Sequence, residues 1–403
     1  MRDLSSEVVD EKKLAQKTVY SILFSISIAH LLNDLLQSII PSVYPMLKQN
    51  YQLTFSEIGF ITFTFQVTAS ILQPFVGNYT DRFPRPYSFA VGMLFTLSGI
   101  LLLAYASIFP FILGAVALIG IGSSIFHPEA SKVSFYASGG RRGLAQSIFQ
   151  LGGNTGSAIG PLLVAVVVIP KGQHYIAWFS IIALLAVFVL VRVGTWYKNH
   201  LFLRASGKVK TDDHRHDLSK GRVVVSIVIL LVLIFSKYFY LTSITSYFTF
   251  YLIHKFHLSI PQSQFHLFVF LASVAAGTVL GGPLGDKFGR KYVIWFSILG
   301  VAPFTLLMPY ADLFWTGVLS VIIGVILASA FSAILVYAQE LVPGKVGMIS
   351  GLFFGFAFGM GGLGSALLGY LADRTSIEFV YSVCAYLPLI GIITVFLPSH
   401  RRP

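Results

Sequence analysis

The sequence has little of what a disulfide-stabilised or water-soluble protein needs. It contains one cysteine, Cys384, which excludes an intramolecular disulfide and a metal site built from cysteines. Charged residues make up only 11% of the 403 residues, whereas hydrophobic residues make up 55% and the mean hydropathy is +0.78. A water-soluble domain does not accommodate so much apolar surface, so the composition predicts a protein embedded in a lipid bilayer.

Long hydrophobic runs, by contrast, recur along the whole chain. A helix needs roughly 20 apolar residues to cross about 30 Å of hydrocarbon. Twelve such runs are present, so we expect an all-α membrane protein with twelve transmembrane helices. They lie near residues 19–47, 55–79, 87–108, 110–136, 143–169, 174–197, 222–253, 262–285, 291–309, 313–340, 347–371 and 376–398.

The net charge of +12 is explained by the distribution of lysine and arginine between the loops. Basic residues collect on alternate loops, and the loops between them hold only Lys48, Lys171, Lys255 and Arg374. The positive-inside rule therefore places both termini in the cytoplasm. Because the basic loops lack the interleaved aromatic residues on which bases stack, we expect no nucleic-acid partner.

The sequence divides into two halves that resemble each other. A hydrophilic stretch separates six predicted spans from six, and GNYTDRFPR at 77–85 matches GPLGDKFGR at 282–290. Such a repeat predicts two six-helix bundles related by an axis along the membrane normal. The expected parts are a cytoplasmic tail at 1–18, a bundle at 19–197, a cytoplasmic linker at 198–221, a second bundle at 222–398 and a tail at 399–403.

Both copies of this G-x-x-x-D-[RK]-x-x-R motif fall on predicted cytoplasmic loops, and the motif resembles the signature loop of the major facilitator superfamily. The second copy has the full pattern, but in the first Pro84 replaces the glycine and cannot take a positive φ. The resemblance implies that Asp81 contacts the start of a helix from the other half when the cytoplasmic side is closed. A topology anchor without a role in switching is the alternative. The motif residues are Gly77, Asp81, Arg82, Arg85, Gly282, Asp286, Lys287, Gly289 and Arg290.

A second motif lies in the fifth predicted span, where Gly156, Gly160 and Pro161 form the element G-x-x-x-G-P. It resembles the element that marks proton-driven antiporters within the superfamily, although close helix packing explains it equally well. Longer strings, among them HLLNDLLQSIIPSVYPML and GSSIFHPEASKVS, resemble bacterial inner-membrane exporters of that superfamily.

This resemblance implies the function. It implies proton-coupled antiport of a small anionic phosphonate-like drug across the bacterial inner membrane, by alternating access. Proton-coupled uptake of a small anionic metabolite is the alternative. We expect a monomer without enzymatic activity or cofactor.

A polar stripe interrupts the first predicted span. His30, Asn33, Asp34 and Gln37 follow the spacing i, i+3, i+4 and i+7, so they share one face of a helix. A lone charge at mid-depth costs roughly 2.5–3.5 kcal/mol, so Asp34 needs water, a partner or a proton. We expect Asp34 to carry protons in a central cavity, with the other three as hydrogen-bonding groups for the substrate. The alternative is that the stripe only joins the first helix to its neighbours.

The fourth predicted span contains FHPEASK, in which His127 and Glu129 lie about 200° apart around an ideal helix. They should therefore not share a face. We group both with Asp34 as candidate proton-coupling residues. The alternatives are a buried neutral imidazole for His127 and a local ion pair with Lys132 for Glu129.

In the second half, Lys237 is the one basic residue that we place near mid-depth. A cation there suits a small anionic substrate, because lysine binds phosphate-like groups as a point charge. Its alternative role is to neutralise Asp34 across the cavity. Further candidates for substrate contacts are Tyr240, Tyr247, Gln150 and Asn154.

We predict no metal site. His30 and Asp34 have no obvious third ligand on their own helix. His214 and His216 flank an arginine in the linker, which is typical of a solvated basic loop rather than of a metal centre.

Overall fold

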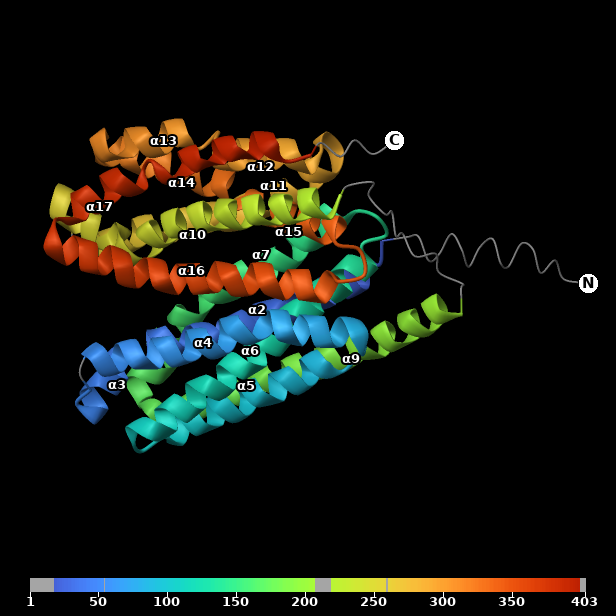
Figure 1. Cartoon of the computed structure of the whole chain (residues 1–403). Helices are drawn as coiled ribbons and strands as arrows, with labels where there is room; N and C mark the ends of the chain where they lie inside the picture. Colours follow the sequence, from blue (N-terminus) through green and yellow to red (C-terminus); the bar gives the residue numbers. More distant parts are fainter. Residues whose placement is uncertain (1–17, 54, 207–218, 259, 399–403) are drawn as a thin grey trace, which may run out of the picture. The chain divides into compact units, whose positions relative to one another are not determined.

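The structure is a computed structural model that describes residues 18–53, 55–206, 219–258 and 260–398. Within these ranges every regular element is helical and no strand occurs, so the predicted all-α class is confirmed (Figure 1). Eleven helical stretches of the described chain are long and apolar enough to cross a membrane. Their outward side chains include Phe75, Val166 and Ile181, which are more than half exposed. Exposed apolar side chains at these positions suit lipid rather than water.

The first six predicted spans all form helical structure. The fifth continues from α7 through a π-helical turn (Val164–Val168) into α8, and the sixth begins with a 3-10 segment (Gln173–Trp178). The α-helices are α2 (Tyr20–Ser42), α3 (Tyr44–Tyr51), α4 (Phe55–Arg82), α5 (Ser88–Tyr105), α6 (Phe109–Ala137), α7 (Arg142–Leu163), α8 (Ile169–Lys171) and α9 (Phe179–Ala205).

The last six spans are helical as well. Short 3-10 segments follow α13 (Met308–Tyr310) and α17 (Leu387–Phe396). The α-helices are α10 (Lys220–Phe256), α11 (Ile260–Phe288), α12 (Arg290–Ile298), α13 (Ala302–Leu307), α14 (Leu313–Ala328), α15 (Ala330–Leu341), α16 (Val346–Arg374) and α17 (Ile377–Cys384).

Three predicted spans divide into two α-helices separated by a turn where the sequence indicated a single helix. The first, 19–47, divides into α2 and α3 around Val43. The ninth, 291–309, turns between α12 and α13, and the tenth, 313–340, divides at Ser329 between α14 and α15. Hydropathy does not reveal such breaks, because the chain stays apolar while its backbone leaves the helix.

The fifth span is not among the eleven apolar stretches. Its helix α7 carries glutamine and asparagine at Gln146, Gln150 and Asn154, together with several glycines. These residues lower its mean hydropathy below that of its neighbours. The helix nevertheless packs along α2 within the first unit of the chain, so it completes the twelve helices of the predicted fold.

The chain forms two compact units. The first comprises Met1–Asp217 and Val342–Gly351, and the second comprises Leu218–Leu341 and Leu352–Pro403. The short segment Val342–Gly351 comes from the second half of the sequence but makes its contacts with the first unit. It includes the first turn of α16.

In the first unit, α2 and α7 approach each other through a row of glycines. A Cβ atom added at Gly152, Gly156 or Gly160 would collide with backbone or side-chain oxygens of α2. Small residues let two helices approach this closely in lipid. The glycines of the G-x-x-x-G-P element therefore pack two helices closely, which was one of the two interpretations of the motif. Pro161 lies within α7, and its side chain is outside the described part of the structure.

The second unit has a hydrophobic core to which α10 contributes most. Tyr240, Ile244, Phe248 and Tyr251 of α10 are buried there. The Tyr251 ring stacks on the ring of Tyr381, with centroids 4.2 Å apart. This core fixes the face of α10 that lies inside the unit.

Candidate functional site

The polar stripe of α2 meets a histidine of α6 in the first unit. His30 Nε2 lies 3.3 Å from Asp34 Oδ2, and His127 Nε2 lies 3.4 Å from Asp34 Oδ1. Both histidine side chains are buried, whereas the Asp34 side chain is 15% exposed. We call these three residues the His–Asp–His cluster. The sequence indicated each of its members but not that His127 completes the set.

Backbone carbonyl groups fix the tautomer of both histidines. His30 Nδ1 lies 2.8 Å from the Phe149 carbonyl oxygen, and His127 Nδ1 lies 3.0 Å from the Ser123 carbonyl oxygen. A carbonyl oxygen only accepts hydrogen bonds, so each Nδ1 must carry a proton and donate it. In the neutral imidazoles, each Nε2 then presents a lone pair to the Asp34 carboxylate.

The cluster therefore requires a cation. Two nitrogen lone pairs and an ionised carboxylate repel one another at these distances, since all three are hydrogen-bond acceptors. A proton placed on an Nε2 or on the carboxyl group turns repulsion into a hydrogen bond. The geometry thus makes the three residues one unit that can share a cation rather than three separate polar groups.

The remaining members of the stripe support Asp34. Asn33 donates to Asp34 Oδ1 at 2.9 Å, and Gln37 donates to the same oxygen at 3.5 Å. The Ser123 hydroxyl donates to Gln37 Oε1 at 3.1 Å. These bonds hold the carboxylate in place, so in this structure Asn33 and Gln37 bind Asp34.

A glycine of α7 provides the space for this arrangement. A Cβ atom at Gly153 would lie 2.5 Å from the Cε1 and Nε2 atoms of His30 and 2.8 Å from Asp34 Oδ2. No side chain other than hydrogen fits here without displacing the cluster. Gly153 was not predicted, because one glycine in a glycine-rich helix carries no distinguishing signal.

Glu129 belongs to a different network on the other face of α6, as the helical spacing predicted. Its carboxylate lies 2.6 Å from Lys132 Nζ and also accepts hydrogen bonds from the hydroxyls of Thr80 and Ser88. Lys132 Nζ lies 3.1 Å from Asp81 Oδ1 and donates to the Thr80 hydroxyl. Lys132 is almost fully buried. The local Glu129–Lys132 ion pair that the sequence allowed is therefore present, within a larger charged network.

Asp81 joins this network to the first turn of α16. Its carboxylate accepts hydrogen bonds from the backbone N–H groups of Gly347 (3.0 Å) and Met348 (2.8 Å). A carboxylate is favoured there by the positive end of the helix dipole. Gly77 and Gly347 pack backbone to backbone, and neither leaves room for a Cβ atom. Arg82 and Arg85, the other residues of this motif copy, are exposed.

The second motif copy makes a different local structure. Gly289, with φ of +95°, alone separates α11 from α12, whereas five residues separate α4 from α5 around Pro84. The two loops thus differ as the proline predicted. Arg290 forms two hydrogen bonds of 2.8 Å with the Glu340 carboxylate and one of 2.9 Å with Asp286. Gly282 is buried and Lys287 is exposed.

Lys237 is buried in the second unit among aromatic rings. Its Nζ atom lies 5.5 Å from the ring centroid of Tyr238 and 5.4 Å from that of Phe331. Among the described residues of this unit, no carboxylate forms an ion pair with it. Cation–π contacts offset only part of the cost of removing an ammonium group from water. Phe331 was not predicted as a neighbour, because its contact depends on how α10 packs against α15.

The other predicted substrate residues are dispersed. Tyr240 lies in the hydrophobic core, and its hydroxyl donates to the Met308 sulfur at 3.8 Å, so in this structure it is a packing residue. Tyr247 packs against the same core and is half-buried. On α7, Gln150 is buried and Asn154 is partly exposed.

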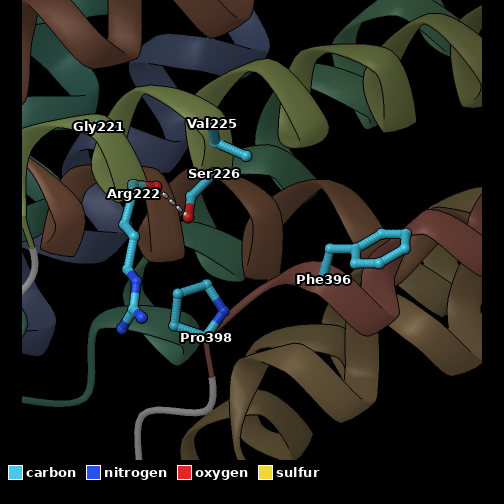
Figure 2. Close-up of a pocket in the computed structure, with 6 residues that line it drawn as sticks. All are labelled: Gly221, Arg222, Val225, Ser226, Phe396 and Pro398. Carbon is cyan, nitrogen blue, oxygen red and sulfur yellow. Dashed lines mark hydrogen bonds between the residues drawn. The ribbon is translucent and has the colours of Figure 1, made fainter.

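A separate pocket lies at the start of α10 (Figure 2). Figure 2 shows the Ser226 hydroxyl bonded to the backbone oxygen of Arg222 at 2.8 Å. No predicted substrate or proton-coupling residue lines this pocket, and it plays no part in the site described above. Its lining residues are Gly221, Arg222, Val225, Ser226, Phe396 and Pro398.

Comparison with known proteins agrees with the fold and the motifs. The family model for the Major Facilitator Superfamily matches residues 26–259 and 230–403. The chain is 61% identical over 387 residues to the fosmidomycin resistance protein of Escherichia coli (strain K12), covering 96% of this chain and 95% of that protein. It is 45% identical over 398 residues to the MFS-type transporter YfnC of Bacillus subtilis (strain 168), covering 97% of both.

Solved structures support the same fold. The human organic anion transporter MFSD10 superimposes with a TM-score of 0.74, covering 94% of this chain and 99% of that one. At 15% identity this likeness concerns the fold alone. The family model matches both halves of the chain, and the two sequence relatives match nearly its whole length. The chain therefore belongs to the major facilitator superfamily.

Proposed function

We propose that this transporter exports a small anionic phosphonate-like compound, such as fosmidomycin, from the bacterial cytoplasm in exchange for protons. Fosmidomycin carries a phosphonate group, and the E. coli relative named for resistance to it is 61% identical. Alternating access between the two sides of the inner membrane is the mode of transport typical of this fold. We further propose that the protein works as a monomer with both termini in the cytoplasm.

The observation that carries the proposal is the environment of Lys237. Its ammonium group is buried, faces aromatic rings and forms no ion pair with a carboxylate in the described part of its unit. A buried cation without an anion is unfavourable. A phosphonate supplies the missing negative charge, and lysine binds such groups as a point charge. The substrate itself thus provides the negative charge that pairs with Lys237.

We assign proton binding to Asp34 within the His–Asp–His cluster. The two imidazoles, each held in the Nδ1–H form, leave the cluster short of a cation, and a proton supplies it. Glu129 was the other candidate, but its carboxylate is occupied by Lys132, Thr80 and Ser88. We therefore assign Glu129 and Asp81 to the network at the start of α16, which opens and closes as the transporter changes conformation.

Uptake of a small anionic metabolite together with protons is the second candidate. It is favoured by charge, because a proton at the His–Asp–His cluster adds positive charge and an anion at Lys237 adds negative charge. Export is favoured by the resistance for which the E. coli relative is named. The direction of proton movement distinguishes the two.

Everted membrane vesicles with an acidic interior provide the test. Exchange drives fosmidomycin into the vesicle as protons leave, whereas drug leaving together with protons would establish symport and overturn the proposal. Asp34→Asn should abolish drug-dependent proton movement. Lys237→Ala should abolish drug transport and Lys237→Arg should retain part of it, while Lys220→Ala, at an exposed lysine, should behave as wild type. An Asp34→Asn variant that exchanges normally would refute the proton assignment.

A further inference from the structure

We propose that the His–Asp–His cluster also binds a divalent transition-metal ion, with Zn²⁺ as the best fit. The proposal concerns the groups that the cluster directs at one another: His30 Nε2, His127 Nε2 and the Asp34 carboxylate. It does not depend on which substrate the transporter carries.

The spacing of the three atoms fits a tetrahedral metal centre. The three groups can each offer one atom such that all lie within 4.8 Å of one another. Zinc binds imidazole nitrogen and carboxylate oxygen at about 2.0–2.2 Å, which puts neighbouring ligand atoms of a tetrahedron about 3.3–3.6 Å apart. His30 Nε2 lies 3.3 Å from Asp34 Oδ2 and His127 Nε2 lies 3.4 Å from Asp34 Oδ1, so the two nitrogens face different oxygens of one carboxylate. An ion held by both nitrogens binds the carboxylate through one of these oxygens after the Asp34 side chain rotates, or through both.

The histidines are also oriented as metal ligands are. A histidine that binds a metal almost always donates its other ring N–H to a carbonyl or carboxylate, which fixes the tautomer. Here Nδ1 of His30 donates to the Phe149 carbonyl and Nδ1 of His127 to the Ser123 carbonyl. Nε2 of His30 is buried and makes no hydrogen bond in the described part of the structure. A buried nitrogen directed at a carboxylate without a hydrogen bond indicates a missing cation.

The site has three protein ligands and one accessible side. The Asp34 side chain is 15% exposed, whereas both histidines are buried, so the accessible side is that of the carboxylate. Three ligands leave the fourth position of a tetrahedron to water, as in zinc sites that exchange a ligand. We therefore expect reversible binding rather than a permanently bound structural ion. If the proposed function holds, a bound ion excludes the proton and stops exchange.

The test is Zn²⁺ binding to the purified full-length chain without an affinity tag, measured by titration calorimetry at neutral pH. The starting protein is His214→Gln/His216→Gln, which removes the closely spaced histidine pair of the hydrophilic linker. We expect one ion per chain. Adding His30→Gln should weaken binding by at least about 100-fold, because loss of a direct ligand exceeds the 10–100-fold effect of losing its supporting partner. His266→Gln, at a histidine bonded to its own helix, should leave binding unchanged.

X-ray absorption of the zinc-loaded His214→Gln/His216→Gln protein provides a measurement that does not require the cluster variant to fold. We expect two imidazole nitrogens and two oxygens around the ion. Absence of saturable binding, unchanged affinity in a folded His30→Gln variant, or a coordination shell without imidazole would each overturn the proposal. Transport is measured separately, so a cluster that binds zinc without blocking fosmidomycin exchange would refute the proposed proton site and leave the metal site intact.

Discussion

Replacing Gly153 by alanine tests whether the geometry of the His–Asp–His cluster matters for transport. The added Cβ atom would lie 2.5 Å from two ring atoms of His30 and 2.8 Å from Asp34 Oδ2. The His30 ring cannot easily move away, because it stacks on Phe149 with centroids 4.0 Å apart and donates to the Phe149 carbonyl at 2.8 Å. The variant must therefore separate His30 from Asp34 or push α7 away from α2.

The free energies involved have opposite signs. Alanine is favoured over glycine inside a helix by about 1 kcal/mol, while forcing an extra methyl group into a filled core costs about 1–3 kcal/mol. The free energy of unfolding should thus fall by about 0–2 kcal/mol. Transport should fall much more, by at least about tenfold, because displacements near 1 Å are enough to disable a positioned site.

Gly114→Ala is the matched control. Gly114 lies in α6, and a Cβ atom there would meet only Leu102 Cδ2, at 3.7 Å. This variant should keep full transport and gain up to about 1 kcal/mol in unfolding free energy. The assay is fosmidomycin uptake into everted vesicles at equal protein amounts, with thermal unfolding of each purified variant. If Gly153→Ala transports as well as Gly114→Ala, the contact between His30 and Asp34 is not part of the working site.

Three further substitutions, two of them with a comparison variant, test the charged network of the first unit and the Gly289 turn by thermal unfolding. Lys132→Met leaves the carboxylates of Glu129 and Asp81 without their buried cation and should lower the free energy of unfolding by about 3–5 kcal/mol. Glu129→Gln should lower it less, because Lys132 still pairs with Asp81. Equal melting temperatures of these two variants would contradict the network. Asp81→Asn removes the charge at the start of α16 and should cost about 1 kcal/mol; a variant as stable as wild type would show that this cap is dispensable. Gly289→Ala forces a side chain into φ of +95° and should lower the free energy of unfolding by roughly 1–2 kcal/mol. Gly221→Ala, with open space around the added Cβ atom, should not lower it. Similar melting temperatures for the two variants would refute strain at the turn.

The sequence predicted the number and approximate bounds of the helices because the bilayer fixes how long an apolar run must be. It did not predict the turns at Val43 and Ser329, because a chain that stays apolar gives no hydropathy signal where it leaves the helix. Residues on one helix could likewise be grouped from their spacing. The stripe of α2 and the opposite faces of His127 and Glu129 follow from the 3.6-residue period alone.

Contacts between different helices could not be predicted from the spacing of residues along each helix. The approach of His127 to Asp34 depends on how far α6 is rotated and shifted against α2, and that is decided by packing along the whole of both helices. The contacts of Thr80 could not be predicted for the same reason. Thr80 precedes Asp81 in the motif, but its hydrogen bonds to Glu129 and Lys132 depend on how α4 packs against α6. A resemblance between motifs suggested the contact of Asp81 with a helix start but not the identity of Gly347 and Met348.

The direction of proton coupling should be visible in drug binding alone. Charge complementarity by itself makes a proton and an anion bind together, so exchange requires that the phosphonate and the proton exclude each other as the protein changes conformation. By thermodynamic linkage, a ligand that displaces one proton binds up to about tenfold more tightly for each unit of rising pH, and one that recruits a proton shows the reverse. We expect fosmidomycin to bind more tightly as pH rises in the wild type and to lose this dependence in Asp34→Asn. Tighter binding at low pH would show that drug and proton are carried together, and export by exchange would then be wrong.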